Sequence, residues 1–333
     1  RFIAADCQAR FAFCEDPLSL RKLLDDRDGL PMLERVVCFA DHVRWKHPDT
    51  EGRTELHVKD LLGADAWAMS AETLAKAGKL KDADVLKKRA ALITADQPFT
   101  FVYTSGTSGP PKGVILSQAA IVFEIQALVE ILDLRDSDSM LLFLPLAHIF
   151  ERIVCFVSLF RGVELIFPSS LDKLIEELSE TRPTIVPSVP RVFETIHKSA
   201  RARAERAGPV ALRTFEWAVR TGVDVARIRH SGERVPTTLM LRYQMARRVV
   251  LDKLQDRLGG AVRYCISGGA PLDKHLAEFF AAFGLPILEG YGLTETTAAA
   301  AVNRLEDFRL GTVGRALPGT EIAIAADGEV LIR

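Results

Sequence analysis

Residues 103–113, with the sequence YTSGTSGPPKG, combine residue types that suit phosphate binding. Gly106 and Gly109 permit positive φ and a close approach of the backbone to a ligand, and Lys112 adds a positive charge. Hydroxyl side chains supply further donors at four positions: Thr104, Ser105, Thr107 and Ser108. Convergent N–H and O–H donors can bind a polyphosphate, so the segment predicts an anion site.

This segment is not a Walker A loop, which requires G-x-x-x-x-G-K-[ST]. Counted from Gly106, the second glycine would fall at position 111, which is proline. A flexible Gly/Ser linker is disfavoured, because the segment lies between an expected apolar strand, 99–104, and an expected apolar helix, 118–132. We therefore predict a phosphate-binding loop that follows a strand and precedes a helix.

Two further segments carry chemistry, residues 267–271 (SGGAP) and 289–296 (EGYGLTET). Taken alone, a Gly-Gly pair is usually only a turn, and Tyr291 could be a core aromatic. Glycines on both sides of Tyr291, however, leave a ring face open for a flat ligand. Glu295 could bind Mg²⁺, which takes few carboxylates together with phosphate oxygens, and Thr294 could donate a hydrogen bond to a phosphate. The three segments together predict a nucleotide site.

Three histidines at positions 42, 47 and 57 raise the question of a metal site in the polar stretch 41–97. Their spacings of five and ten residues do not repeat on one face of a helix. We therefore interpret them as solvated surface histidines. The five cysteines form no C-x-x-C pair, which favours reduced thiols in a cytoplasmic protein over a zinc or redox motif.

The composition indicates a folded protein with a large core. The chain has 333 residues, of which 48% are hydrophobic and 26% charged, and its net charge is -1. This balance excludes a disordered or fibrous chain and disfavours a nucleic-acid partner. Basic stretches at 201–206 and 242–248 are interpreted as solvated helix faces, with contact to a membrane surface as the alternative.

The elements that position these residues follow from hydrophobic periodicity. Strands are expected at 11–15, 36–39, 99–104, 140–144, 164–167, 184–187, 262–267 and 287–289. Helices are expected at 17–28, 83–91, 118–132, 149–160, 171–180, 192–205 and 273–283, and residues 211–258 look almost wholly helical. This alternation predicts an α/β fold of mostly parallel sheets flanked by helices. At the end of the chain, strands 321–325 and 329–332 around Asp327-Gly328 predict a β-hairpin.

These motifs resemble those of the adenylate-forming superfamily of acyl- and aryl-CoA synthetases, adenylation domains and luciferases. Residues 104–113 match its phosphate loop, 291–296 (YGLTET) its adenine-side motif, and 145–148 (PLAH) a motif near its carboxylate site. Residues 311–318 (GTVGRALP) and 328–333 (GEVLIR) match later segments. The segments LEGYGLTET and GGAPL and the helical stretch make the chain most similar to bacterial long-chain fatty-acid CoA ligases.

The resemblance implies the stacked, mostly parallel sheets of the superfamily's large N-terminal domain. It also implies a two-step reaction, in which ATP activates a long-chain fatty acid to its acyl-adenylate and coenzyme A then displaces AMP. The alternatives are a fatty acyl-AMP ligase that loads a carrier protein, and a non-catalytic core that binds nucleotide or acyl chain.

The resemblance also implies roles for individual residues. Lys112, Thr294, Glu295 and His148 form the catalytic set, and Glu295 and Thr104 bind Mg²⁺. His148 would lie near the acyl group, although it could instead cap a helix or satisfy a core carbonyl. The implied ATP-binding residues are Thr104, Ser105, Gly106, Thr107, Ser108, Gly109, Gly269, Ala270, Pro271, Glu289, Gly290, Tyr291, Gly292 and Thr294.

The domain expectation is a core over residues 1–320 and the start of a β subdomain over 321–333. The chain begins at Arg1 and ends at Arg333 within an expected strand, so we expect it to be part of a longer protein that lacks here the family's small C-terminal lid. By itself it should be weakly active or inactive. Expected partners are fatty acid, ATP and coenzyme A, and the sequence leaves open a homodimer and peripheral membrane contact.

Overall fold

The computed structural model describes residues 1–46, 53–63, 67–79, 83–104, 109–170 and 173–333. The chain divides into two compact units. The first comprises residues 1–97 and 103–114, and the second comprises residues 98–102 and 115–333. Each is described separately below. No helix among the described residues is long and apolar enough to cross a membrane.

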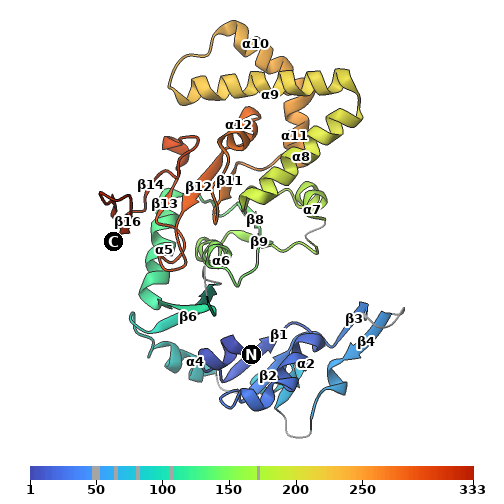
Figure 1. The fold of residues 1–333 in the computed structure, drawn as a ribbon, viewed down its shortest axis with the longest axis vertical. Coiled ribbons are helices and arrows are strands. Elements are labelled where there is room, and N and C mark those ends of the chain that lie inside the picture. Colours follow the sequence, from blue (N-terminus) through green and yellow to red (C-terminus); the bar gives the residue numbers. More distant parts are fainter. Residues whose placement is uncertain (47–52, 64–66, 80–82, 105–108, 171–172) are drawn as a thin grey trace. The chain divides into compact units, whose positions relative to one another are not determined.

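The first unit has a parallel sheet in the order β1-β2-β5, with helices and an antiparallel hairpin, β3–β4 (Figure 1). The strands are β1 (Phe11–Cys14), β2 (Arg35–Cys38), β3 (His42–Lys46), β4 (Arg53–His57) and β5 (Ala68–Ser70). The helices are α1 (Phe2–Asp6), α2 (Pro17–Asp25), α3 (Ala71–Gly78) and α4 (Ala83–Ala90), with short 3₁₀ turns η1 (Arg27–Gly29) and η2 (Val58–Asp60).

Local sequence explains where the elements of this unit begin. Helix α2 starts at Asp16, whose carboxylate accepts the Ser19 N–H at 2.8 Å, and Pro17 occupies the first turn, where a missing N–H costs nothing. The helix packs over a small core that contains Leu20, Val36 and Trp67. The polar stretch expected to hold short helices thus also contains three strands, β3, β4 and β5.

The phosphate-loop segment lies between two strands, which corrects one expectation. Strand β6 (Pro98–Thr104) and strand β7 (Lys112–Ser117) form a two-stranded sheet, so the loop precedes a strand rather than a helix. Residues after the two prolines form a strand because exposed and buried side chains alternate there: Ile115 is exposed and Leu116 is buried. The expected helix follows only afterwards, as α5 (Gln118–Ile131), capped by the Ser117 hydroxyl.

The second unit is built on a seven-stranded sheet in the order β14-β13-β12-β11-β10-β8-β9. Strands β9, β8, β10, β11 and β12 are parallel, and β13 and β14 continue the sheet antiparallel. The strands are β8 (Ser139–Leu141), β9 (Glu164–Ile166), β10 (Ile185–Ser188), β11 (Tyr264–Ser267), β12 (Ile287–Tyr291), β13 (Ala301–Val302) and β14 (Arg315–Ala316). The predicted mostly parallel α/β class is confirmed.

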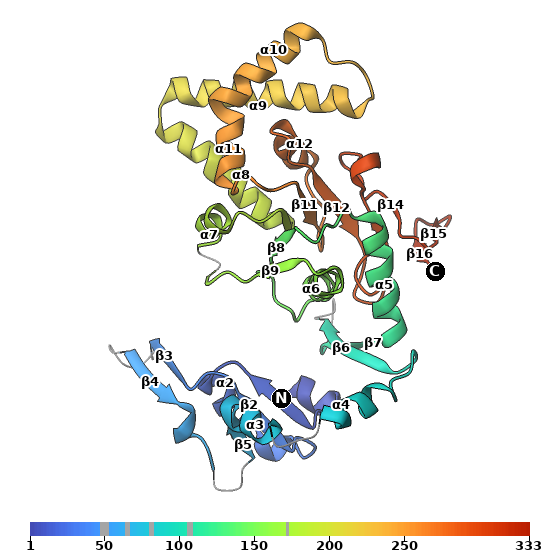
Figure 2. The ribbon, with the colours of Figure 1, turned by 180° about the vertical axis from the view of Figure 1, so that it is seen from behind.

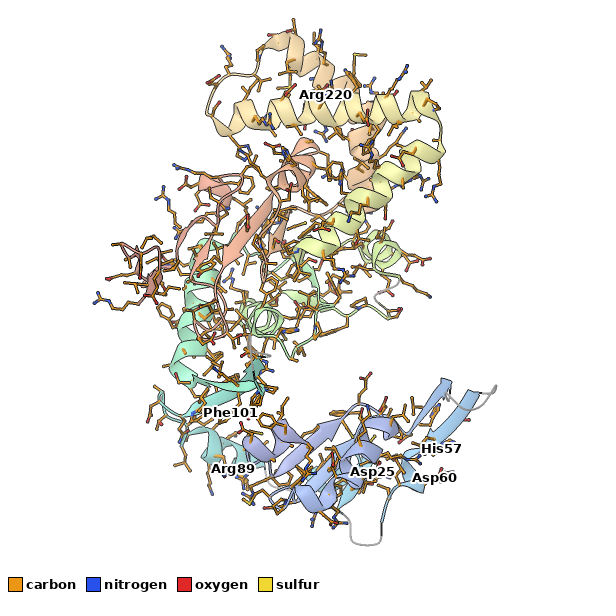
Figure 3. All side chains as sticks on the ribbon, viewed as in Figure 1. Asp25, His57, Asp60, Arg89, Phe101 and Arg220 are labelled. Atoms are coloured by element: carbon orange, nitrogen blue, oxygen red, sulfur yellow. The ribbon has the colours of Figure 1, made fainter. Side chains whose placement is uncertain are left out.

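Helices flank this sheet. Helix α5 packs beside α6, and the long helix α9 contacts α8, α10 and α12 (Figures 1 and 2). The remaining helices are α6 (Ile149–Arg161), α7 (Leu174–Thr181), α8 (Pro190–Arg206), α9 (Pro209–His230), α10 (Thr237–Ala246), the π-helix η4 (Arg247–Leu251), α11 (Asp252–Arg257), α12 (Lys274–Ala282) and the 3₁₀ turn η5 (Leu305–Asp307). The expectation that residues 211–258 are almost wholly helical is confirmed. Arg220 is one of the exposed side chains that project from α9 (Figure 3).

The amino ends of the parallel strands are held by an ion-pair cluster. Asp138 precedes β8, and Arg263 precedes β11. The Arg263 guanidinium donates to Asp138 Oδ1 at 3.0 Å and to Asp133 Oδ2 at 2.7 Å. Thr184, which precedes β10, donates its hydroxyl to Asp138 Oδ1 at 2.7 Å. One buried carboxylate therefore ties three strands together where they begin.

The chain closes on the predicted hairpin. Strands β15 (Ile322–Ile324) and β16 (Val330–Ile332) pair antiparallel, with Ile324 opposite Val330. Gly328 has φ +91°, which suits the Asp-Gly turn. The domain boundary expected at residue 320 stays a prediction. All five cysteines, which belong to the described part of the chain, are free thiols.

Candidate functional site

Three of the sequence motifs follow parallel strands of the same sheet. Residues 145–148 (PLAH) come after β8, residues 268–271 (GGAP) after β11, and residues 292–296 (GLTET) after β12. Because the strands are parallel, these segments all leave the sheet at its carboxyl edge (Figure 2). This edge is where open α/β sheets bind ligands.

The segment after β8 is held by Glu151 on helix α6. The Glu151 side chain is completely buried and accepts the Leu144 N–H at 3.2 Å, whereas its Oε2 has no hydrogen-bond partner among the described residues. Burial raises the pKa of Glu151 to about 7, although the backbone N–H groups of Leu144 and Phe143 oppose the shift. This carboxyl is therefore enclosed by protein.

His148 occupies the N-cap position of α6 without capping it. Its side chain is exposed and makes no hydrogen bond to the first turn of the helix. The Arg152 N–H donates to the His148 carbonyl at 3.3 Å. The His148 side chain therefore neither caps the helix nor donates to a core carbonyl group of the described residues. Its imidazole faces outward at the carboxyl edge.

The turn after β11 lies against α6 and β12. A Cβ at Gly268 would lie 3.5 Å from the Phe150 ring, so this turn contacts the start of α6. Gly269 has φ +79°, a conformation that favours glycine. The Leu272 N–H donates to Glu289 Oε1 at 3.0 Å. Glu289 was predicted to line the nucleotide site, and the structure shows its carboxylate holding this turn in place.

The turn after β12 has a tightly packed backbone. A Cβ at Gly292 would lie 1.5 Å from the Ala298 carbonyl oxygen, so only glycine fits. The Thr296 hydroxyl accepts the Leu293 N–H at 2.9 Å and closes the turn. Thr297 and Ala298 both have positive φ, 65° and 109°. Such conformations persist only where the surrounding structure fixes them.

Helix α5 supplies the contact that fixes this turn. Glu124 Oε1 accepts the Ala299 N–H at 2.8 Å. Burial raises the pKa of Glu124 to about 8, partly offset by the Ala299 N–H. Burial also raises the pKa of Glu289, and the hydrogen bond from the Leu272 N–H partly offsets this shift. Each of the three turns is thus held by one buried glutamate: Glu151, Glu289 or Glu124.

Sequence reasoning missed Glu124 and Glu151 as positioning residues. Glu124 lies on the buried face of α5, where a charged residue breaks the apolar pattern, and that break was the available signal. It also missed Ser188, which aligns with Ser267 at the ends of β10 and β11. Both hydroxyls are buried and lack a hydrogen-bond partner among the described residues.

The remaining predicted residues of this edge are accessible to a ligand. Glu295, Gly269, Ala270 and Pro271 are exposed. Tyr291, Gly290, Gly292 and Thr294 are half-buried. Next to the edge, Leu142, Leu144 and Glu151 line a cavity of about 370 Å³ together with Phe143, Leu146 and residues 167–170. Leu142 and Leu144 therefore border this cavity, whereas Val186 lies in the core.

The phosphate-loop predictions fall partly outside the described structure. Ser105, Gly106, Thr107 and Ser108 lie outside the described residues. Thr104 ends β6 half-buried, Gly109 has φ +92°, and Lys112 begins β7 with an exposed side chain. Near the carboxyl end of β6, the Tyr103 hydroxyl donates to Asp6 Oδ2 at 2.6 Å. That hydrogen bond raises the pKa of Tyr103 to about 12.

The family model of AMP-binding enzymes matches residues 1–332. This chain belongs to the AMP-binding enzyme family. Long-chain-fatty-acid–CoA ligases named FadD15 are similar to it at 37% identity in Mycobacterium bovis and 36% in Mycobacterium tuberculosis. Each match covers 88% of this chain and 52% of the relative, so the chain spans about half the length of these curated relatives.

Two solved structures share the fold of this chain over nearly its whole length. An anthranilate CoA ligase in complex with anthranoyl-AMP aligns with 100% of this chain and 51% of its own, at a TM-score of 0.60 and 19% identity. The N-terminal domain of FACL13 from Mycobacterium tuberculosis aligns with 97% of this chain and 73% of its own, at a TM-score of 0.56 and 22% identity. At these identities the likeness concerns the fold alone.

Proposed function

We propose that this chain is the nucleotide- and acyl-binding part of an ATP-dependent long-chain fatty-acid–CoA ligase. The observation that carries the proposal is the carboxyl edge of the seven-stranded sheet, where three family motifs follow β8, β11 and β12. The similarity to long-chain-fatty-acid–CoA ligases supports the choice of substrate.

The proposed reaction has two steps. A fatty-acid carboxylate oxygen attacks the α-phosphorus of ATP, and the bond to the bridging oxygen breaks to release pyrophosphate. The thiol of coenzyme A then attacks the acyl carbonyl, loses its proton and expels AMP. Such a site works by positioning and charge neutralisation, and little proton transfer is required of the protein.

The residues of this chain have distinct parts in the proposal. Tyr291 offers a ring face to the adenine, Thr294 donates to the α-phosphate or carboxylate, and His148 contacts the acyl side. Lys112 and the loop 104–109 bind the β- and γ-phosphates. Glu295 fits Mg²⁺ because it presents an exposed carboxylate, and the ion takes few such ligands beside phosphate oxygens. With Thr104, Glu295 would hold the ion, which neutralises phosphate charge.

The test is fatty-acid-dependent pyrophosphate release by the full-length protein. We expect release with a long-chain fatty acid and trapping of the acyl-adenylate by hydroxylamine. Lys112→Ala should raise the KM for MgATP at least about tenfold, a loss of about 1.4 kcal/mol. Lys79→Ala, which removes an exposed lysine from the end of α3, is the matched control. An unchanged KM in Lys112→Ala would reject that assignment.

The choice of acyl acceptor is separable from the first step. Release of AMP that depends on coenzyme A supports the ligase, whereas acyl transfer only to a carrier protein supports an acyl-AMP ligase. ATP binding without fatty-acid-dependent pyrophosphate release would reject catalysis in favour of a binding core. Cytoplasmic location, a homodimer and peripheral membrane contact remain predictions, which fractionation, light scattering and vesicle sedimentation would test.

A further inference from the structure

The hairpin β3–β4 places three ligand-type side chains on one face. Its strands pair antiparallel with His42 directly opposite His57 and Val43 opposite Leu56. Glu55 precedes His57 by two residues, and side chains alternate between the faces of a strand. His42, Glu55 and His57 therefore share one side of the ribbon. Directly opposed side chains lie about 5 Å apart at Cβ, within ligand distance of each other.

Burial of the opposite face fixes this orientation. Leu56 is only 7% exposed and Val43 is half-buried, and helix α2 contacts both strands. A shift of register by one residue would bury the polar side chains, so the alternation is strongly specified. Next to the two histidines, the Val58 N–H donates to the Asp41 carbonyl at 2.7 Å, which adds one more backbone hydrogen bond between the two chain segments. The two histidines thus sit at the fixed end of the ribbon.

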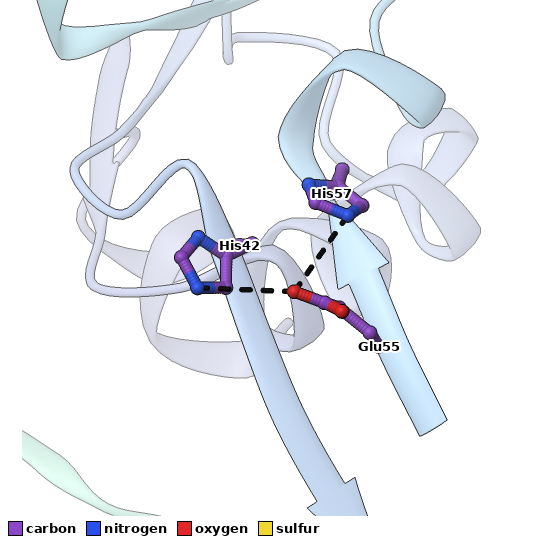
Figure 4. Close-up of side chains that lie close together, drawn as sticks. All are labelled: His42, Glu55 and His57. Carbon is purple, nitrogen blue, oxygen red and sulfur yellow. Dashed lines mark ion pairs between the residues drawn. The ribbon is translucent and has the colours of Figure 1, made fainter. Parts of the chain in front are cut away.

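The three side chains gather around one point (Figure 4). Glu55 Oε1 lies 3.9 Å from His42 Nε2 and 3.8 Å from His57 Nε2. The imidazole rings have centroids 5.6 Å apart. One ligand atom from each residue lies within 4.8 Å of the other two. Their side chains are 53%, 36% and 39% exposed for His42, Glu55 and His57, so a hydrated ion has access to the nitrogens.

We propose that His42, Glu55 and His57 form a binding site for Zn²⁺. Zinc is bound in proteins by two histidines and one glutamate with a fourth position left to water. Bonds of about 2.0–2.2 Å in a tetrahedral arrangement place ligand atoms about 3.3 Å apart. The present spacing reaches this value by small side-chain rotations on the exposed face. Imidazole ligands favour zinc over Mg²⁺, which prefers oxygen.

The proposed site rests on a relation between these histidines that their sequence spacing does not show. The spacing of His42, His47 and His57 was tested against the period of a helix, whereas the segment forms two strands. Across an antiparallel pair, the relevant quantity is the register, which puts positions 42 and 57 opposite each other. His47 lies outside the described residues. The exposure of His42 and His57 agrees with their interpretation as surface histidines.

The first experiment is a titration of the full chain with Co²⁺ and then Zn²⁺. Cobalt bound by nitrogen and oxygen in a tetrahedral site absorbs visible light, and Zn²⁺ should displace it with one equivalent. His42→Ala and His57→Ala should each lower Zn²⁺ affinity by at least about tenfold. Glu55→Gln, which keeps the shape but loses the charge, should also weaken binding. Wild-type affinity in all three variants would overturn the proposal.

A matched control is available on helix α12. His275 lies 3.4 Å from Glu278, as an exposed histidine beside a glutamate, but Arg227 already binds that carboxylate at 2.8 Å. His275→Ala should therefore keep wild-type Zn²⁺ affinity. Loss of binding in this variant would show that exposed histidines bind the ion unspecifically, and would also overturn the proposal.

The second readout does not depend on affinity. In histidine-selective NMR spectra, one equivalent of Zn²⁺ should shift the ring signals of His42 and His57 and leave those of His275 unchanged. Without metal, the three variants should melt at the wild-type temperature, because the replaced side chains lie on the exposed face. Ring signals of His42 and His57 that remain unshifted at one equivalent would reject the site.

Discussion

The two ends of the parallel strands in the seven-stranded sheet use carboxylates in opposite ways. At the amino end, Asp138 is charged and held by Arg263 and Thr184. At the carboxyl end, Glu151, Glu289 and Glu124 each accept a backbone N–H, and their pKa values are raised by burial. The amino end is thus closed by ion pairs. The carboxyl end is held by buried glutamates whose pKa values are raised, and these residues leave the turns open to a ligand.

The two ends should therefore respond to pH with opposite sign. Burial would raise the pKa of Asp138, but hydrogen bonds from Arg263 and Thr184 outweigh it and hold that pKa below its usual value. This contribution to stability is present above the unfolded pKa and is lost as acid protonates the folded form. Glu124 binds its proton more tightly when folded, so its cost to stability grows between about pH 4.5 and pH 8.

The largest effect is expected at the amino end. Arg263→Met leaves Asp138, which is 2% exposed, without its cation. Removing one partner of a buried pair costs about 3–5 kcal/mol. The free energy of unfolding, measured in urea at pH 7, should fall by that amount. Arg333→Met breaks only the exposed pair with Glu321 and should cost less than about 1 kcal/mol. Equal losses in the two variants would contradict the closed amino end.

The next effect concerns the turn after β12. Gly292→Ala forces a methyl group into the Ala298 carbonyl, so we expect a loss of about 3 kcal/mol or more in stability. Gly290→Ala, two residues earlier, meets its nearest neighbour at 3.4 Å and should be tolerated. Urea unfolding of both variants tests the difference. If Gly292→Ala is as stable as the wild type, the turn is not held as closely as described.

A smaller and pH-dependent effect is expected from Glu124→Gln. The amide oxygen can still accept the Ala299 N–H, but no charge forms at high pH. The variant should match the wild type near pH 5 and exceed its stability at pH 7 by on the order of 2 kcal/mol. Thermal unfolding across this range gives the measurement. Parallel pH curves for the two proteins would show that Glu124 does not titrate in the folded state.

The smallest stability effect is expected from Glu295→Ala, at an exposed position of the carboxyl edge. Its unfolding free energy should change by less than about 0.5 kcal/mol. The Mg²⁺ concentration needed for half-maximal pyrophosphate release should rise several-fold in the full-length protein. A variant with unchanged Mg²⁺ dependence would remove Glu295 from the proposed metal set without affecting the architecture of the edge.

Local patterns allowed most of the fold to be predicted. Helix α5 was expected from its apolar period, and the short buried strand β11 from an apolar run between helices. The role of Glu124 could not be foreseen, because its partner Ala299 lies far along the chain and only the packed sheet brings them together. Strand β7 was missed because its alternating residues follow directly on a Pro-Pro pair.

The site was predicted by motif rather than by contact. The segments that carry Gly269 and Tyr291 were identified from residue types, whereas the segment that carries His148 was identified from the family resemblance. Their common sheet edge follows from parallel pairing. Which carboxylates are enclosed and which are exposed depends on packing that no single segment encodes. The sequence therefore could not distinguish Glu289, which holds a turn, from Glu295, which faces solvent.

The pairing of β8 with β10 has a consequence for the order of folding. These neighbours join residues 140 and 185 through an intervening helix, strand and second helix, whereas β3 and β4 join residues of one hairpin. Contacts between distant parts of a chain form slowly, and hairpins close in microseconds. We expect the histidine-bearing ribbon to form early in refolding, and the carboxyl edge of the seven-stranded sheet to form only when the whole sheet has assembled.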